Sequence, residues 1–219
     1  MMERIKRVVD TVGTAVLVVC AIVVTGLVVR RELGGRGAGS PVVAVVEDWE
    51  RLASGGHRIG SPDAELRIIE FSDFQCPYCR RAAATLDSVR RELGDRVAVI
   101  YRHFPLESIH PHAMEAALAA ECAADQGAFT RLHDVLFQYQ DSIGTMSWTR
   151  FAELARVPDP TQFSMCVRGG EHERRVRDDI AAAHRIGVQG TPTFVLNGMV
   201  LRGVLSAAEW KAVLDEADR

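Results

Sequence analysis

The chain has 219 residues, which suits one domain with short appendages or two small domains. Its 47% hydrophobic and 25% charged residues are an ordinary globular mixture, and its net charge of -3 at pH 7 excludes a strongly basic surface for nucleic acid. We therefore expect no nucleic-acid partner.

Residues 11–29 form an uncharged apolar run of nineteen residues. As a helix this run would rise about 28 Å, close to the hydrocarbon thickness of a bilayer. We predict an uncleaved transmembrane signal anchor, with residues 1–10 in the cytoplasm and the larger C-terminal part on the extracytoplasmic side. A cleaved signal peptide is the alternative, although its apolar region would be shorter and a small-residue cleavage site would follow at once.

Residues 30–41 are rich in glycine and are predicted to be a flexible linker. Residues 42–219 make up the predicted folded domain. The apolar first segment of this domain, residues 42–53, is interpreted as a helical lead-in. The stretch 55–65, which contains several glycines and a proline, is interpreted as a turn-rich entry.

The next three segments predict a strand, a helix and a second strand. The sequence "LRIIEF" (66–71) is short and apolar, as in a buried strand. Residues 77–93 are predicted to be helical, with Pro77 at the first position, where its missing N–H does no harm. The second strand is "RVAVIYRHF" (96–104). This order and spacing indicate a βαβ unit with a parallel pair of strands.

A helical block is expected to interrupt this fold at about residues 107–168. Its longest segment, residues 112–140, is strongly helix-forming and has a predicted break at Gly127. Shorter helices are predicted at residues 147–157 and 160–167.

After the block, the sequence predicts a helix, a hairpin and a closing helix. The first helix is expected at residues 171–186. Residues 193–203 have the pattern of two strands joined at an Asn-Gly pair, which is a strong hairpin signal. Residues 206–217 open with a serine followed three residues later by a glutamate, the pattern of a capping box. The predicted fold class is therefore α/β with a helical insertion.

The chemistry of the chain is concentrated in Cys76-Pro77-Tyr78-Cys79, at the predicted junction of a strand and a helix. Cys76 would take the N-cap position, where unpaired N–H groups and the helix dipole stabilise a thiolate. Such a placement lowers a cysteine pKa to about 3.5–7.5. Cys79, one turn further on, is near enough to form a disulfide with Cys76 and is predicted to be the more buried partner. We therefore predict that Cys76 attacks and that Cys79 resolves the mixed disulfide.

A metal site is the competing interpretation of the cysteine pair. A structural zinc ion takes four protein ligands, and one C-x-x-C motif supplies two. The sequence has no second C-x-x-C motif, and it has no nucleotide, flavin or haem motif. The βαβ context favours redox chemistry, so we expect no metal and no cofactor.

Two motifs together resemble the thioredoxin superfamily, and within it the exported, membrane-anchored, DsbA-like thiol–disulfide oxidoreductases of bacteria. The sequence "EFSDFQCPYC" (70–79) is similar to the family's active-site strand and helix start. The sequence "GVQGTPTFVLNG" (187–198) is similar to its loop with a cis-proline. The resemblance begins near Gly60, continues to the end of the chain, and implies a thioredoxin fold with a helical insertion.

The resemblance implies roles for three residues. Pro192 would be a cis-proline that faces the cysteines, and Thr191 would pair with an extended substrate strand. Glu70 would be a buried acid beneath the disulfide, with a raised pKa, that exchanges a proton with Cys79. From the residues alone, the alternatives are an ordinary trans proline and a partly exposed carboxylate, and Asp73 is interpreted as a turn residue.

The Pro77-Tyr78 dipeptide departs from the pattern of DsbA itself, which usually has Pro-His. A Pro-Tyr pair is similar to that of many glutaredoxins and of other exported members of the family. Because the dipeptide tunes the thiolate and hence the reduction potential, the resemblance does not carry over the behaviour of a strong oxidant.

Cys122 and Cys166 both fall in the predicted helical block. Their even number and the exported context favour a structural disulfide between two helices. The resemblance implies the same, since related exported members have a second disulfide. Two separate buried thiols are the alternative.

The favoured function is disulfide formation in unfolded or reduced exported proteins, with the Cys76–Cys79 disulfide regenerated by a quinone-linked membrane oxidase. A disulfide reductase or isomerase with the same site is the alternative, although isomerases of this superfamily usually have a separate dimerisation domain. A copper-binding thiol chaperone is the third hypothesis. It would need a histidine or methionine near the cysteines, and Met199 is the nearest candidate in the C-terminal hairpin.

Overall fold

The computed structural model describes Thr25 and residues 42–218. Apart from Thr25, the predicted N-terminal segment 1–10, signal anchor 11–29 and linker 30–41 lie outside the described residues. Within the described part of the chain, no helix combines the length and the apolar character that crossing a bilayer requires.

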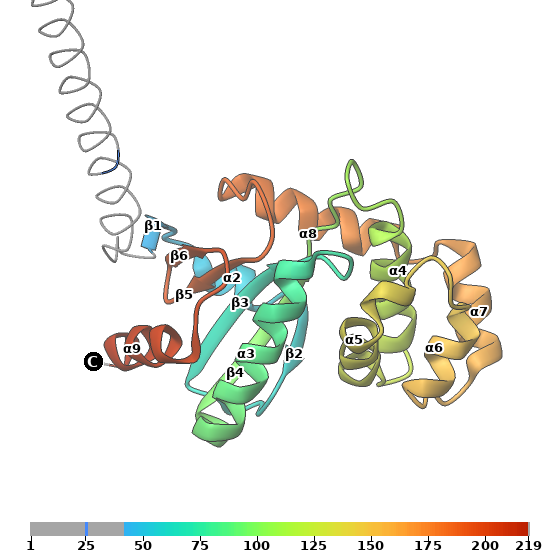
Figure 1. The fold of residues 1–219 in the computed structure, drawn as a ribbon, viewed down its shortest axis with the longest axis horizontal. Coiled ribbons are helices and arrows are strands. Elements are labelled where there is room, and N and C mark those ends of the chain that lie inside the picture. Colours follow the sequence, from blue (N-terminus) through green and yellow to red (C-terminus); the bar gives the residue numbers. More distant parts are fainter. Residues whose placement is uncertain (1–24, 26–41, 219) are drawn as a thin grey trace, which may run out of the picture. The chain divides into compact units, whose positions relative to one another are not determined.

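A six-stranded mixed sheet forms the centre of the fold (Figure 1). Its strands lie side by side in the order β1-β6-β5-β3-β4-β2. Strands β3 and β4 pair in parallel, and the other neighbouring strands pair antiparallel. The strand bounds are β1 Val42–Val45, β2 His57–Ile59, β3 Leu66–Ser72, β4 Val97–His103, β5 Thr193–Leu196 and β6 Met199–Arg202.

Helices cover both faces of the sheet, and the alternation of side chains along the strands creates a core on each face. On one face, α3 (Pro77–Leu93) and α9 (Ala207–Ala217) pack over a core that includes Ile68. On the other face, α2 (Trp49–Ala53) and α8 (Glu173–Arg185) pack over a core that includes Ile69. Every residue of β4 is buried, which is why its sequence is apolar almost throughout.

The helical block joins the core on the α3 face. It consists of α4 (Ala113–Ala124), α5 (Phe129–Gln138), the short 3-10 helix η2 (Gln140–Ser142), α6 (Trp148–Leu154) and α7 (Pro160–Gly169). The predicted break is present between α4 and α5, where Gly127 adopts a φ of 64°. Figure 1 shows α4 to α7 gathered to one side of α3. The insertion limits of 107–168 stay a prediction.

A disulfide joins Cys122 of α4 to Cys166 of α7, with the two Cα atoms 5.9 Å apart. Both cysteines are buried within the helical block. The bond therefore links the first helix of the block to its last helix, across an intervening stretch that contains α5 and α6.

The entry to the domain differs from the sequence-based interpretation. Residues 42–53, expected to be a helical lead-in, form the strand β1 and the short helix α2. The stretch 55–65, expected to be irregular, contains the strand β2. Strands β1 and β2 are edge strands that pair with β6 and β4. Strands of three or four residues show too little periodicity to be identified, and their form is decided by the partner strand.

We expect the Cys122–Cys166 disulfide to stabilise the fold substantially. It closes a loop with a sequence separation of 44 residues, so its removal should lower the free energy of unfolding by roughly 3–4 kcal/mol in the chain-entropy model. Guanidinium unfolding of the Cys122→Ala, Cys166→Ala and double variants measures this loss. The three variants should be about equally destabilised, because each breaks the same bond, and a loss below about 1 kcal/mol in all of them would contradict the prediction.

Candidate active site

Cys76 lies where β3 leads into α3. It is the N-cap residue of α3, and Pro77 stands in the first turn. Because the first N–H groups of a helix have no partner within the helix, the positive end of the helix dipole faces the Cys76 sulfur. Tyr78 is 54% exposed, and the Arg81 guanidinium carbon lies 4.6 Å from the centre of its ring.

The surroundings of Cys76 stabilise a thiolate. The largest cause is the neighbouring Cys79 thiol, and Thr191 and the backbone N–H groups of Cys79 and Tyr78 act in the same direction. Burial opposes them, but the net effect lowers the pKa of Cys76 from 9.0 to about 5. Cys76 is therefore ionised at neutral pH, the state in which a cysteine attacks a disulfide.

Cys79 has the opposite character. It is completely buried in the first turn of α3, and this burial raises the pKa of its thiol well above the ordinary value. The negative charges of Cys76 and Glu70 raise the pKa further. Cys79 is therefore protonated at neutral pH, and it must lose a proton before its sulfur can act as a nucleophile.

Glu70 lies in β3 and is only 1% exposed. The Ser72 hydroxyl donates a hydrogen bond to Glu70 Oε1 at 2.8 Å. Burial raises the pKa of Glu70 from 4.5 to about 7, against the lowering effect of the Ser72 hydrogen bond and with a smaller contribution from the charge of Cys76. The carboxyl group is therefore positioned to gain or lose a proton near neutral pH.

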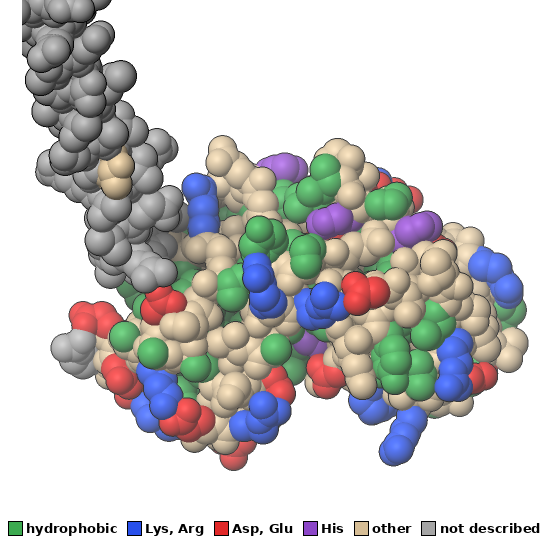
Figure 2. Space-filling model, in the orientation of Figure 1, with side chains coloured by type: hydrophobic (Ala, Val, Ile, Leu, Met, Phe, Trp, Pro, Cys, Tyr) green, Lys and Arg blue, Asp and Glu red, His purple; other side chains and the backbone are tan. Residues whose placement is uncertain are grey.

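The second motif lies beside the cysteines because β5 pairs antiparallel with β3, with Thr193 opposite Phe71. The Thr191–Pro192 peptide bond is cis, and the Cys76 sulfur lies 3.5 Å from the Thr191 carbonyl oxygen. A surface groove of about 390 Å³ runs along this loop. Its lining residues are Tyr78, Gln189, Gly190, Thr191, Pro192, Thr193, Arg202 and Gly203. In the space-filling view, hydrophobic side chains gather around the start of α3, with basic side chains beside them (Figure 2).

The helical block holds the active-site loop through Gln140 of η2. Its Nε2 atom donates to the carbonyl oxygen of Phe74 at 2.7 Å and to that of Cys76 at 3.0 Å. Gln140 is buried, so its amide is committed to these two carbonyl groups. Gln140 was not predicted from the sequence, because a glutamine within a helical block carries no pattern that marks such a contact.

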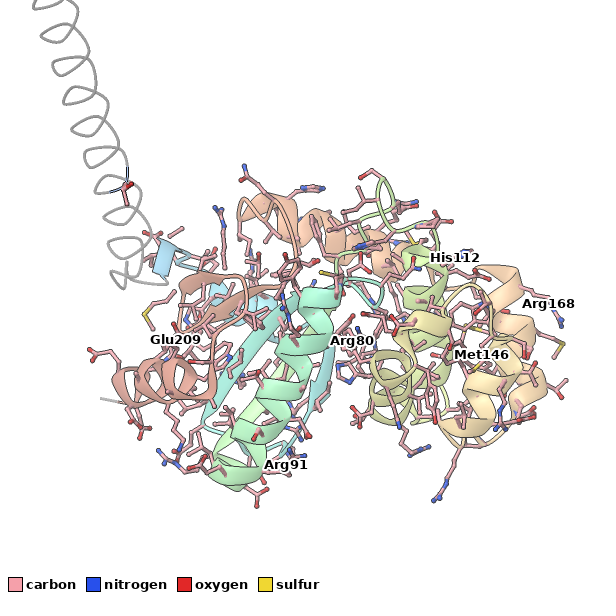
Figure 3. The ribbon with its side chains drawn as sticks, viewed as in Figure 1. Arg80, Arg91, His112, Met146, Arg168 and Glu209 are labelled. Carbon is pink, nitrogen blue, oxygen red and sulfur yellow. A yellow bond between two sulfur atoms is a disulfide. The ribbon has the colours of Figure 1, made fainter. Side chains whose placement is uncertain are left out.

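Asp73 connects the same loop to the segment that follows β4. Its carboxylate accepts the N–H groups of Gln75 at 2.7 Å and Leu106 at 2.8 Å, and His110 Nδ1 lies 2.7 Å from its Oδ2 atom. Asp73 thus shapes the turn, as the sequence indicated, and also ties it to a distant segment. Figure 3 shows Arg80 on the side of α3 that faces the helical block, where its guanidinium pairs with Asp141 at 3.0 Å.

A second cluster with metal-ligand chemistry lies elsewhere in the fold. Glu121 Oε1 is 2.8 Å from His57 Nε2 and 3.1 Å from His103 Nε2, and Glu121 Oε2 is 3.3 Å from Arg175 Nη1. Burial raises the pKa of Glu121, but the hydrogen bonds from the two histidines outweigh it and hold the pKa well below its usual range. Both carboxylate oxygens therefore have partners, and we describe the cluster as an ion-pair network that links β2, β4, α4 and α8.

Comparison with known proteins places this geometry in a family. Residues 53–216 match the thioredoxin family. The fold resembles a thioredoxin-like oxidoreductase from Silicibacter pomeroyi, with a TM-score of 0.66 and 24% identity over 79% of this chain and 98% of that one. It also resembles BdbD from Bacillus subtilis, with a TM-score of 0.68 and 18% identity over 80% and 97% of the two chains. Pseudomonas aeruginosa DsbA2 gives a TM-score of 0.62 and 24% identity over 73% and 92%.

The sequence also resembles part of some longer proteins. A Na(+)/H(+) antiporter NhaA 1 from Mycobacterium sp. (strain KMS) is 40% identical over 154 residues, which are 69% of this chain and 25% of that protein. A Na(+)/H(+) antiporter NhaA from Herminiimonas arsenicoxydans is 34% identical over 163 residues, covering 74% and 26%. The chain thus spans about a quarter of the length of the curated relatives it matches.

We expect Cys76 to titrate far below an ordinary thiol. With a pKa of about 5, its thiolate absorbance near 240 nm and its rate of alkylation by iodoacetamide should rise through pH 5 and level off by pH 7. Cys79 should remain unmodified over this range, because burial keeps its thiol protonated. The Cys76→Ser variant is the control and should lose the transition. A midpoint above pH 8 would contradict the prediction.

We expect Glu70 to make the reduced protein less stable as the pH rises. The pKa of Glu70 is about 7 in the folded protein and 4.5 ordinarily. Its contribution to the free energy of unfolding is therefore greatest below pH 4.5, and it falls by on the order of 3 kcal/mol as the pH rises through 7. Urea unfolding at pH 4, 6 and 8 measures this fall. Glu70→Gln should remove it and should exceed the wild type in stability at pH 8.

The exposed Glu65 provides the matched control for this experiment. Glu65→Gln removes the same charge near the start of β3 without a buried carboxyl group, and it should retain the fall in stability of the wild type. If the Glu70→Gln and wild-type curves run parallel from pH 4 to pH 8, Glu70 does not have the raised pKa.

Proposed function

Because the chain belongs to the thioredoxin family and has a DsbA-like fold, we propose that it is a thiol–disulfide oxidoreductase that forms disulfides in exported proteins. The Cys76–Cys79 disulfide is the oxidant, and a pair of substrate thiols supplies the two electrons. A substrate thiolate attacks the Cys76 sulfur, and Cys79 leaves. The second substrate thiolate then attacks the mixed disulfide and releases Cys76.

The contrast between the two cysteines is the observation that carries this proposal. The pKa of Cys76 is lowered to about 5, whereas that of Cys79 is raised. A thiolate that is stabilised in the reduced protein makes the disulfide easier to reduce, and so makes the protein a stronger oxidant. The same contrast makes Cys76 the better leaving group from a mixed disulfide. Both effects favour donation of the disulfide to a substrate.

The groove beside the cis-proline loop supports a polypeptide substrate. An extended segment can pair with the backbone of Thr191 while its cysteine reaches the Cys76 sulfur. The exposed ring of Tyr78 offers apolar contact at one side of this groove. Unfolded or reduced proteins present such extended segments, and folded proteins usually do not.

The proposed place of action is the extracytoplasmic side of the cell membrane. The apolar run 11–29 would serve as the anchor. The Cys122–Cys166 disulfide supports an oxidising compartment, because structural disulfides are rare in the cytoplasm. After each turnover the reduced cysteine pair needs an oxidant, and a quinone-linked membrane oxidase is the proposed partner.

Copper binding is less well supported, because the hairpin separates its candidate ligand from the cysteines. Met199 pairs with Leu196 next to the turn, whereas Thr193 and Arg202 pair at the other end of the hairpin. Thr193 and Arg202 line the groove beside Pro192. Met199 is therefore at the end of the hairpin away from that groove.

The reduction potential of the Cys76–Cys79 pair tests the direction of electron flow. Equilibration of the purified protein with glutathione buffers should give a reduction potential of about −120 mV, toward the oxidising end of the family range, because the Cys76 thiolate is stabilised. A reduction potential of about −270 mV would make the protein a reductase and would contradict the proposal. Refolding of a reduced disulfide-containing substrate is the matching activity assay. Cys76→Ser should abolish that activity.

A further inference from the structure

The groove beside the cis-proline loop has a charged residue in its wall. Among the described residues that line the groove, Arg202 is the only charged one. It is the last residue of β6, is exposed, and pairs with Thr193 across the hairpin. The next residue, Gly203, donates its N–H to the Pro192 carbonyl oxygen at 3.1 Å. The backbone at Arg202 is therefore fixed against the cis-proline loop.

The guanidinium group of Arg202 is committed to a single carbonyl group. Its Nη2 atom donates to the Gly187 carbonyl oxygen at 3.2 Å, and within residues 42–218 it forms no ion pair with a carboxylate. Arg80, near the active-site end of α3, is by contrast paired with Asp141. A guanidinium group has five N–H donors in a planar fork that matches the two oxygens of a carboxylate. Arg202 can therefore bind a carboxylate that a partner brings into the groove.

Two further features add positive charge near the same groove. The Arg81 guanidinium carbon lies 4.6 Å from the centre of the Tyr78 ring, and Tyr78 is part of the groove wall. The N-terminal end of α3, where Cys76 is the N-cap residue, is the positive end of the helix dipole. A Cys76–Cys79 disulfide carries no charge. In the oxidised protein the groove is therefore positive, with no acidic residue among its described lining residues.

We propose that the groove selects extended polypeptide segments with an aspartate or glutamate within about three residues of the reacting cysteine, and that Arg202 binds this carboxylate. The spacing follows from the sheet, in which β5 lies between β3 and β6. Neighbouring strands are about 4.8 Å apart, so β6 lies about 10 Å from β3, and an extended segment covers that distance in about three residues. This inference rests on the proposed function and adds the substrate class.

The preference should be moderate in size, because Arg202 is exposed to water. One exposed ion pair changes an equilibrium by a factor of up to about five. Replacing an acidic side chain by a basic one turns attraction into repulsion, so the rates of two such substrates should differ by about 10-fold at low salt. Salt should reduce the difference, because the screening length falls from about 10 Å at 0.1 M to about 3 Å at 1 M.

Peptides with two cysteines test the preference. The peptides differ only at the residue two positions from the first cysteine, which is glutamate, glutamine or lysine. The rate at which the oxidised protein oxidises each peptide should be highest for glutamate and lowest for lysine, with a ratio of about 10 at low salt and about 2 at 1 M salt. Because a neighbouring charge also alters the peptide thiol, each rate is divided by that of the same peptide with hydroxyethyl disulfide, a small neutral disulfide.

Two variants of Arg202 and a matched control assign the preference to this residue. In Arg202→Gln the ratio of the glutamate and lysine rates should fall to about 2 or less, whereas Arg202→Lys keeps the charge and should retain most of the ratio. A general change in the reactivity of Cys76 cancels in this ratio. The control is Arg58→Gln, which should keep the wild-type ratio. Arg58 is also exposed and also donates to a single carbonyl group, that of Pro62 at 3.3 Å, but it lies in β2 at the opposite edge of the sheet.

The outcomes separate this inference from the proposed function. Wild-type protein that oxidises the glutamate and lysine peptides at equal corrected rates would overturn the acidic preference and leave the proposed function in place. A preference that is unchanged in Arg202→Gln would overturn the role of Arg202. Wild-type protein that oxidises none of the peptides would refute the proposed function, and the substrate preference with it.

Discussion

The stabilised negative charge on Cys76 is the feature on which the rest of the site depends. A thiolate in a partly enclosed position needs hydrogen-bond donors that are fixed in advance, since water reaches it poorly. The first turn of α3 and the Cys79 thiol supply most of them. Thr191, from a segment far along the chain, places its backbone carbonyl oxygen 3.5 Å from the Cys76 sulfur. The antiparallel pairing of β5 with β3 brings it there, so the central sheet is a requirement of the chemistry.

Burial gives the other two ionisable groups their character, at a cost to stability. Glu70 and Cys79 both lie in the core on the α3 face, where the uncharged form of each is favoured. A core made only of apolar side chains would be more stable above neutral pH. The polar groups Glu70 and Ser72 hydrogen-bond each other there, which limits the penalty of burial. The site therefore combines an ionised sulfur near the surface with a neutral acid and thiol beneath it.

The helical block does more than enlarge the core. Gln140 holds the carbonyl groups of the active-site loop, and Asp73 ties that loop to the segment before α4. The Gln140 contacts are buried, where hydrogen bonds are strong and leaving one unmade is costly. The loop that presents Cys76 is thus fixed from two sides, by the cis-proline loop and by the helical block. The Cys122–Cys166 disulfide constrains the same block.

The sequence by itself determined most of the regular elements and the reactive pair, whereas the tertiary structure decided the edge strands and how the pair is tuned. Helix α3 and the hairpin were predictable because their signals are local: a proline at the helix start and an Asn-Gly turn. The edge strands β1 and β2 were not, because a strand of three or four residues takes its form from its partner. The role of Gln140 depends on contacts with a distant segment and on burial, and no local pattern of residues records either.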